Sequence, residues 1–306
     1  MPCHTSRALR LLRLAVLAAV ASPAVAPRPP LPASVPAPLS FWTLQEPTGA
    51  PRVGDAFGAS APAVLLDGNA SSPIARVAVA QGPFGAFAAS FAPAPGAGVN
   101  NSRRLAAARA TAPALTTALG GAAATVTVVA WVRDASPSSA LIAGVWNEHA
   151  AARQYALFSA LPACSSAPAY VRGAAGHASN CGGPTPGSRY CETRACDPRP
   201  LPAGAWHCLA MTYNGTHIGA LVNGTALPNG DAQPFAYAGG LYSPEAAGRP
   251  GAEFAVGANV INVTAGGPPL WSNVFTGDVG GLAVFAQGLA ADDVARVCAL
   301  AEGFGE

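Results

Sequence analysis

Short runs of mostly apolar residues recur along the second half of the chain. In TVTVVAWVR at 125–133, one side of an extended chain carries valine and alanine, and the other carries threonine, valine and Trp131. Because both sides are fairly apolar, this run predicts a strand that is covered on both faces. Comparable runs follow at 140–146, 154–161, 206–213, 217–222, 252–258 and 277–285.

No segment between these runs reads as a helix long enough to connect two parallel strands, which excludes a βαβ organisation. Short strands separated by turns then leave a sandwich or a barrel. One helix is predicted at 290–301, AADDVARVCALA, where Asp292 and Asp293 stand in the first turn and interact favourably with the helix dipole. The Ala-rich piece SRRLAAARA at 102–110 reads as a second, shorter helix.

The triplet Asn-Gly-Thr occurs twice in the segment from His207 to Leu227. Asn-Gly between apolar runs is a strong hairpin signal, because both turn residues then take a positive φ. Asn214-Gly215 is therefore predicted as the turn between the runs at 206–213 and 217–222. Asn223-Gly224 is predicted as the turn that leaves the second of these strands.

The N-terminus has the layout of a secretory signal peptide, with arginines first, an apolar run next and small residues after it. We assign residues 1–21 to the signal, with cleavage as late as residue 26 as the alternative. A transit peptide and a membrane anchor are the rival readings, but the apolar run falls short of the roughly 20 residues that a spanning helix needs. Residues 22–40 hold many prolines and are predicted to form an extended leader outside the fold.

Acceptor sequences for N-glycosylation support export. Composition alone predicts roughly one Asn-x-Ser/Thr in a chain of this kind, whereas five occur. The asparagines are Asn69, Asn100, Asn214, Asn223 and Asn262. We therefore expect a secreted, extracellular glycoprotein with no integral membrane segment after signal cleavage.

The cysteines also fit an exported chain. Six remain once Cys3 leaves with the signal, and an even number in an oxidising compartment predicts three disulfides of unassigned connectivity. They are Cys164, Cys181, Cys191, Cys196, Cys208 and Cys298. Zinc is the alternative, although the first four lack a Cys-x-x-Cys spacing.

Charge and motifs narrow the classes of function. The formal net charge is +2 and only 10% of the residues are charged, so no basic face is expected and nucleic acid is excluded as a partner. The carboxylates are scattered, and no nucleophile, metalloprotease or phosphate-loop motif occurs. The sequence therefore predicts a protein that is not an enzyme.

Four segments resemble the concanavalin A-like lectin/glucanase superfamily, in its laminin-G-like branch. They are FWTLQEPTGAP at 41–51, VTVVAWVR at 126–133, LPAGAWHCLAMTYNGTHIGALVNGT at 201–225 and FTGDVGGLAVFAQGLAADDV at 275–294. The resemblance implies one all-β domain over residues 41–306, a two-sheet antiparallel jelly-roll sandwich with a short C-terminal helix. Its members include lectins, glucanases and adhesion modules, so the fold does not choose a function.

The glucanases of this superfamily carry their carboxylates as Glu-x-Asp-x-Glu on one strand, a spacing that this sequence lacks. We therefore predict a non-catalytic module that binds carbohydrate or a glycoprotein at a cell surface or in the extracellular matrix. A glycoside hydrolase with an unusual carboxylate pair and a structural or protein-binding surface domain remain as alternatives.

Two sets of residues are candidate sites. Polar side chains and aromatic rings near strand connections predict a ligand rim formed by Trp146, Asn147, Glu148, Arg153, Tyr190 and Trp271. Many laminin-G-like domains bind calcium, and Asp67, Asn69 and Asp278 offer oxygen ligands for it. The branch's usual aspartate is replaced here by Ala92, so any calcium would depend on these substitutes.

Overall fold

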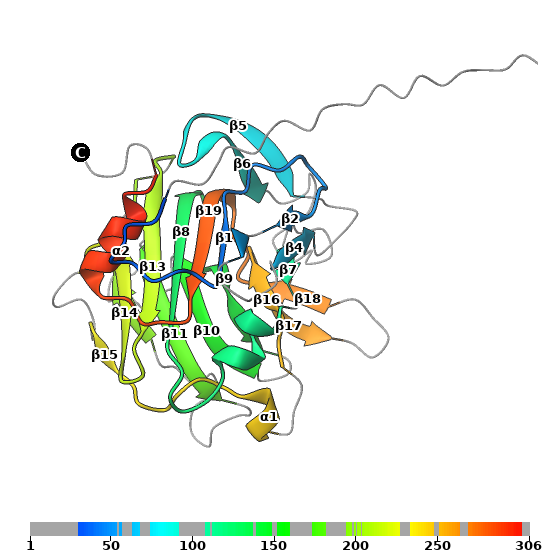
Figure 1. Cartoon of the computed structure of the whole chain (residues 1–306). Helices are drawn as coiled ribbons and strands as arrows, with labels where there is room; N and C mark the ends of the chain where they lie inside the picture. Colours follow the sequence, from blue (N-terminus) through cyan, green and yellow to red (C-terminus); the bar gives the residue numbers. More distant parts are fainter. Residues whose placement is uncertain are drawn as a thin grey trace, which may run out of the picture.

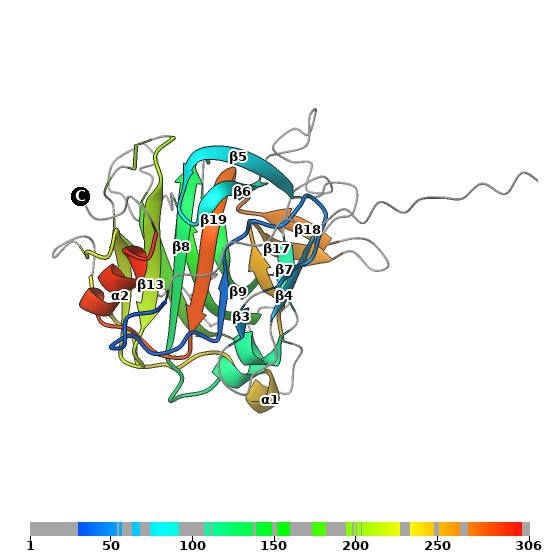
Figure 2. The same ribbon diagram turned by 45° about the horizontal axis from the view of Figure 1, so that its top comes forward.

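Two antiparallel sheets packed face to face make up the fold (Figures 1 and 2), which confirms the predicted sandwich. The structure is a computed structural model. It describes residues 30–53, 55–56, 63–67, 74–91, 108–110, 112–136, 139–148, 152–159, 173–181, 194–197, 199, 201–202, 204–226, 233–247, 251–263 and 269–301. All further statements concern these residues.

The first sheet has nine strands in the order β15-β14-β13-β8-β19-β1-β3, with β6 paired to β19 and β5 to β6. Their bounds are β1 Ser40–Trp42, β3 Asp55–Ala56, β5 Ala75–Gly82, β6 Gly85–Phe91, β8 Val126–Asp134, β13 His207–Tyr213, β14 His217–Val222, β15 Phe235–Ala236 and β19 Gly277–Phe285. The strongest predicted runs thus lie at the centre of this sheet.

The second sheet has ten strands in the order β12-β11-β10-β9-β16-β7-β4-β2, with β17 paired to β9 and β18 to β17. Their bounds are β2 Arg52–Val53, β4 Val64–Asp67, β7 Ala108–Ala110, β9 Ala140–Asn147, β10 Ala152–Ser159, β11 Ala174–Cys181, β12 Arg194–Asp197, β16 Phe254–Val256, β17 Asn259–Val263 and β18 Pro269–Ser272. A single bridge between β17 and β9 is parallel.

The helices are short. The predicted C-terminal helix is confirmed as α2, Ala291–Cys298, and α1, Pro244–Ala247, adds one turn. The helix expected at 102–110 is wrong where the structure describes it, because Ala108–Ala110 form strand β7 between β4 and β16. Pairing on both sides outweighs the high intrinsic helix propensity of alanine there.

The main core lies between the sheets. Val126, Val128, Ala130 and Val132 of β8 point into it, as the alternation predicted. Larger side chains complete it from both sheets, among them Trp42, Tyr155, Tyr213 and Phe254. Burial of these apolar surfaces holds the two sheets together.

A second apolar cluster covers the outer face of the nine-stranded sheet, where α2 packs across β13 and β8 (Figure 1). Trp131 lies at its centre and donates its indole N–H to the carbonyl of Cys298, at 3.1 Å. A disulfide joins Cys208 of β13 to Cys298 at the end of α2. The helix is therefore attached to the sheet both covalently and by packing.

Residues 22–40 were predicted to form an extended leader outside the fold, but part of this segment packs against the sandwich. Val35 is buried in the same outer cluster, and Leu31 packs against it. Arg296 of α2 donates to Ser34 Oγ at 3.2 Å. The proline-rich composition suggested an extended spacer, but its few aliphatic residues find an apolar face beside α2, so the domain includes residues 31–40.

The two Asn-Gly-Thr triplets form different turns. At the second, Asn223 and Gly224 have φ of 50° and 75°, and Val222 and Thr225 exchange backbone hydrogen bonds, as predicted for a two-residue hairpin turn. At the first, only Gly215 has a positive φ, of 92°. There the Asn214 carboxamide accepts the backbone N–H groups of Thr216 and His217, so Asn214 precedes the turn rather than forming its centre.

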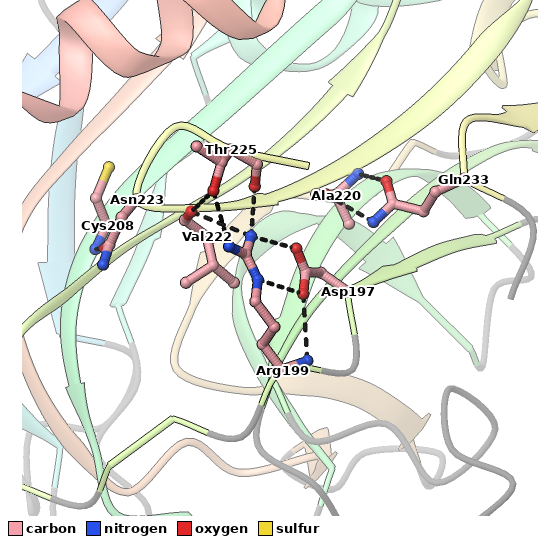
Figure 3. Close-up of polar contacts among 8 residues, drawn as sticks. All are labelled: Asp197, Arg199, Cys208, Ala220, Val222, Asn223, Thr225 and Gln233. Carbon is pink, nitrogen blue, oxygen red and sulfur yellow. Dashed lines mark hydrogen bonds and ion pairs between the residues drawn. The ribbon is translucent and has the colours of Figure 1, made fainter. Parts of the chain in front are cut away.

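An arginine ties the end of β12 to the second turn (Figure 3). Arg199 donates to both carboxylate oxygens of Asp197, at 2.9 and 2.5 Å, and to the hydroxyl of Thr225 at 2.7 Å. It also donates to the carbonyls of Val222 and Thr225. The Asp197 side chain is 0% exposed, so this cation is what compensates the buried carboxylate.

Arg199→Met is expected to lower the free energy of unfolding by about 2–3 kcal/mol, because it leaves the buried Asp197 carboxylate without its partner and Arg199 itself is partly exposed. Urea denaturation checks this. The matched variant Asp197→Asn/Arg199→Met removes both charges and should cost less than the two single changes added together. Additive losses would contradict the assignment.

Candidate functional site

A polar group is embedded in the apolar outer face of the ten-stranded sheet. That face is formed by the buried side chains of Leu141, Trp146, Ala156, Phe158, Ala175, Cys196, Ala255 and Ala258. Among them lie Glu148, Arg153 and His177, which together with Trp146 and Phe158 we call the Trp146 cluster. It lies on the face opposite the core, on strands β9, β10 and β11 and the residue after β9.

Strand register brings the cluster together. Arg153 of β10 pairs with Trp146 of β9, and a bulge follows Arg153 before Tyr155 resumes the ladder. His177 of β11 pairs with Ala156 of β10. The bulge inserts an extra residue, which lets Arg153 and the outward-facing Ala156 share one face although they are three residues apart.

Glu148 is the hub of the cluster. Trp146 Nε1 donates to Glu148 Oε1 at 2.6 Å, and Arg153 Nε donates to Glu148 Oε2 at 2.6 Å. Arg153 Nη2 also contacts Oε2. The carboxylate therefore holds the indole and the guanidinium in fixed positions, as charge-assisted hydrogen bonds do when they are partly shielded from water.

His177 lies edge-on between two aromatic rings, 5.2 Å from the Trp146 centroid and 5.1 Å from that of Phe158. It is 7% exposed, and neither ring nitrogen has a hydrogen-bond partner among the residues that the structure describes. Burial, together with the positive charge of Arg194, lowers the pKa of His177 to about 3. The imidazole is therefore neutral at physiological pH and offers one donor and one acceptor.

Arg153 also has unused hydrogen-bonding capacity, because its Nη1 is buried with no partner in the described part of the chain. Each buried polar group left without a partner costs on the order of 1–3 kcal/mol. Native proteins contain few such groups, and a bound water, ion or ligand is one explanation for those present. The Trp146 cluster thus offers donors and an acceptor between aromatic rings, an arrangement suited to a ligand with hydroxyl groups and apolar faces.

The predicted ligand rim is brought together only in part. Trp146, Glu148 and Arg153 are in direct contact, and Asn147 separates the first two at the end of β9. Trp146 was expected as an exposed aromatic in a connection, but it is 5% exposed and belongs to the strand itself. Trp146 ends the apolar run at 140–146, and its ring lies in the same buried cluster as Leu141 and Phe158.

The other two residues of the predicted ligand rim, Trp271 and Tyr190, are not part of the Trp146 cluster as far as the structure describes them. Trp271 stands in β18, paired with Val260, and its side chain is outside the described residues, as is all of Tyr190. His177 was missed by the sequence reading. Its strand, AAGHASNC, is rich in alanine, glycine and serine, so neither propensity nor alternation marks it as a strand.

The predicted calcium ligands do not meet in the part of the structure that is described. Asp278 accepts two hydrogen bonds from Arg133, at 2.9 and 2.6 Å, which leaves it a poor cation ligand. Asp67 ends β4 in the opposite sheet, and its side chain, like all of Asn69, lies outside the described residues. No group of three His, Cys, Asp or Glu side chains suited to a metal occurs among the residues searched.

The structure describes some of the predicted N-glycosylation asparagines and some of the cysteines. Asn214 and Asn223 are exposed at the two turns, Asn262 stands in β17, and Asn69 and Asn100 lie outside the described residues. Besides the Cys208–Cys298 bond, Cys196 is disulfide-bonded. The side chain of Cys181 and all of Cys164 and Cys191 lie outside the description. Glycan occupancy and the remaining connectivity stay predictions.

No protein-family model matches the sequence, and no curated protein is detectably similar to it. Solved structures do share its general shape. Domain 4 of the extracellular arabinanase AbnA from Geobacillus stearothermophilus, solved with arabinotriose, is 13% identical over 79% of this chain and 90% of its own, with a TM-score of 0.44. The CBM40 of Ruminococcus gnavus IT-sialidase, solved with α2,3-sialyllactose, is 14% identical over 57% of this chain and 82% of its own, with a TM-score of 0.39.

A botulinum neurotoxin type C structure is 8% identical over 85% of this chain and 50% of its own, with a TM-score of 0.48. At such identities and scores, none of these proteins specifies a ligand for this chain. Within the described residues, no helix is long and apolar enough to cross a membrane.

Proposed function

We propose that the chain is a secreted, non-catalytic binding module that holds a carbohydrate at the Trp146 cluster. The observation that carries the proposal is the pair of partnerless groups there, Arg153 Nη1 and the two ring nitrogens of His177, buried between Trp146 and Phe158. Sugar hydroxyls both donate and accept hydrogen bonds, and the C–H faces of a sugar ring pack on aromatic rings. Such a ligand would supply the missing partners.

Secretion is supported by two independent features. The Cys208–Cys298 bond belongs to the kind of covalent link that persists in oxidising compartments. Both Asn-Gly-Thr acceptor sequences stand at exposed turns, where glycosylation would be sterically open. We also propose that calcium assists binding, which the comparison of binding with calcium and with EDTA tests.

His177→Phe is expected to weaken carbohydrate binding at least roughly tenfold, because it removes two polar atoms while keeping a ring of similar size. The secreted chain would be screened against soluble laminarin, arabinan, xylan and polygalacturonate, with calcium and with EDTA. The affinity for any polysaccharide that binds would then be compared with that of the variant by isothermal titration calorimetry. His217→Phe, at an exposed histidine of the hairpin, is the matched control and should bind like the wild type.

The same substitution separates binding from folding. Replacing a buried, unpartnered imidazole with an apolar ring should leave the fold as stable or more stable. Weaker binding with unchanged or raised stability would support a ligand site. Unchanged affinity in His177→Phe and in Arg153→Met would refute the site, and no binding to any polysaccharide would favour a protein partner.

A glycoside hydrolase is the second candidate, favoured by one observation. Glu253 directly precedes β16, whose first residue pairs with Val145, so Glu253 approaches the same end of β9 as Glu148. Paired carboxylates are what glycoside hydrolysis needs. Both oxygens of Glu148 are already engaged by Trp146 and Arg153, which argues against this role. Release of reducing sugar from a bound polysaccharide, abolished by Glu148→Gln, would establish hydrolysis and overturn the non-catalytic proposal.

A further inference from the structure

A second polar site lies at one end of the sandwich, between the sheets and apart from the Trp146 cluster. His207, the first residue of β13, pairs with Val132 of β8, whose side chain points into the main core. Asp134 ends β8 two residues later and therefore faces the same side. The exposed fractions are 2% for Asp134 and 8% for His207. Residues placed diagonally across two strands are within reach of each other through their side chains.

The Asp134 carboxylate acts electrostatically on the His207 imidazole. Burial lowers the pKa of His207, and the contact with the Pro202 carbonyl and the nearby Asp134 carboxylate partly offset that lowering. The imidazole is thus neutral in the folded protein at physiological pH. It carries a single N–H, and the other ring nitrogen is an acceptor.

The hydrogen-bond partners of His207 indicate which of its two ring nitrogens carries the proton. His207 Nε2 faces the Pro202 carbonyl oxygen at 3.4 Å, and a carbonyl can only accept, so the proton belongs on Nε2. His207 Nδ1 is then an acceptor, and within the described ranges it is buried without a partner. Asp134 Oδ1 accepts the backbone N–H of Ser136 at 2.7 Å, whereas Asp134 Oδ2 is a second buried acceptor without a partner.

We propose that Asp134 Oδ2 and His207 Nδ1 bind one internal water molecule, which donates a hydrogen to each. By register the two side chains are within reach of each other, and two acceptors cannot bond to each other. A species with two donors can satisfy both. Water meets that need, and buried waters characteristically join polar groups that have no other partner. The water links the end of β8 to the start of β13.

A metal ion is the other species that binds two acceptors, and the donor set argues against it. Zinc sites in proteins use three or four protein ligands. Among the described residues, no third His, Cys, Asp or Glu side chain lies close enough to this pair to complete a metal site. A neutral donor therefore fits the two acceptors better than a cation does.

The test is a crystal structure of the secreted protein at neutral pH combined with NMR of the same protein. We expect a light-atom density peak within hydrogen-bond distance of both atoms, and a water–protein cross-peak from a long-lived water. Long-range ¹H–¹⁵N correlation should report His207 Nδ1 without a proton. Elemental analysis by mass spectrometry should find no bound transition metal.

Variants complete the test. His207→Phe should lose the density peak and the cross-peak, whereas Asp134→Asn keeps a polar atom in place and should retain both. A direct Asp134–His207 hydrogen bond, a proton on Nδ1, or a stoichiometric metal would each overturn the proposal. The measurements on the wild-type protein decide it even where a variant fails to fold.

Discussion

Removing the Cys208–Cys298 disulfide is expected to lower the free energy of unfolding by about 4–5 kcal/mol, given that the bond closes a loop with a sequence separation of 90. In the double variant Cys208→Ala/Cys298→Ala, the unfolded chain regains the freedom that the bond removes. Both cysteines are buried in the outer cluster, so the folded state also loses some packing there. Urea denaturation at constant pH measures the loss.

The location of the loss can be checked independently. Hydrogen exchange should accelerate most at the α2 amides of Val294 and Val297, because α2 then loses its covalent link and keeps only packing and hydrogen bonds such as that from Trp131. The single change Arg296→Gln on the exposed face of the same helix serves as the control and should change little. A loss below about 1 kcal/mol would mean that packing alone holds the helix, against the loop-entropy estimate.

The second large effect is acid sensitivity due to His177. Its pKa is about 3 in the folded protein, against 6.5 for the ordinary side chain. Between these two values the unfolded chain binds a proton at this residue that the folded protein does not bind. Stability therefore falls as the pH falls, by about 1.4 kcal/mol per pH unit from this one group once the pH is well below 6.5.

His177→Phe removes the residue whose protonation differs between the unfolded and folded states. The variant's stability should decline less steeply than that of the wild type between pH 6 and pH 4, by close to one proton in the linkage slope, as measured by urea denaturation at several pH values. The control His217→Phe removes an exposed histidine and should leave the slope unchanged. Equal slopes for wild type and His177→Phe would mean that His177 is protonated in the folded state, and the neutral imidazole would have to be abandoned.

Sequence patterns predicted the structure correctly where the conformation that a segment favours by itself is also the one that its packing in the fold needs. The alternation in β8 predicted both of its faces correctly, because each face packs against an apolar layer. The acidic first turn of α2 and the Asn223-Gly224 turn were readable for the same reason, since each depends on its neighbours in the chain. Asn214-Gly215 shows the limit: an identical triplet adopts another turn once the Asn214 carboxamide binds the backbone ahead of it.

Weakly marked segments depended on pairing partners instead. The alanines of β7 and the small residues of β11 become strands because neighbouring strands supply their hydrogen bonds, and no local pattern records that. The candidate site was readable to the extent that Trp146, Glu148 and Arg153 are close in sequence. Its fourth polar member could not be found that way, because His177 reaches the cluster through strand order.

The amino-acid sequence by itself determined that this protein is a turn-rich all-β fold with a C-terminal helix, since alternation, turn chemistry and the helix's first turn are local properties of the chain. The choice of a sandwich over a barrel came from the family resemblance and not from these local patterns. Only the tertiary structure decided that residues 31–40 belong to the domain, that Trp146 is buried, and that His177 and His207 are held neutral beside polar groups without partners. The physical reason is that burial and hydrogen-bond satisfaction depend on what the rest of the chain places around a side chain, and spacing along the sequence does not encode it.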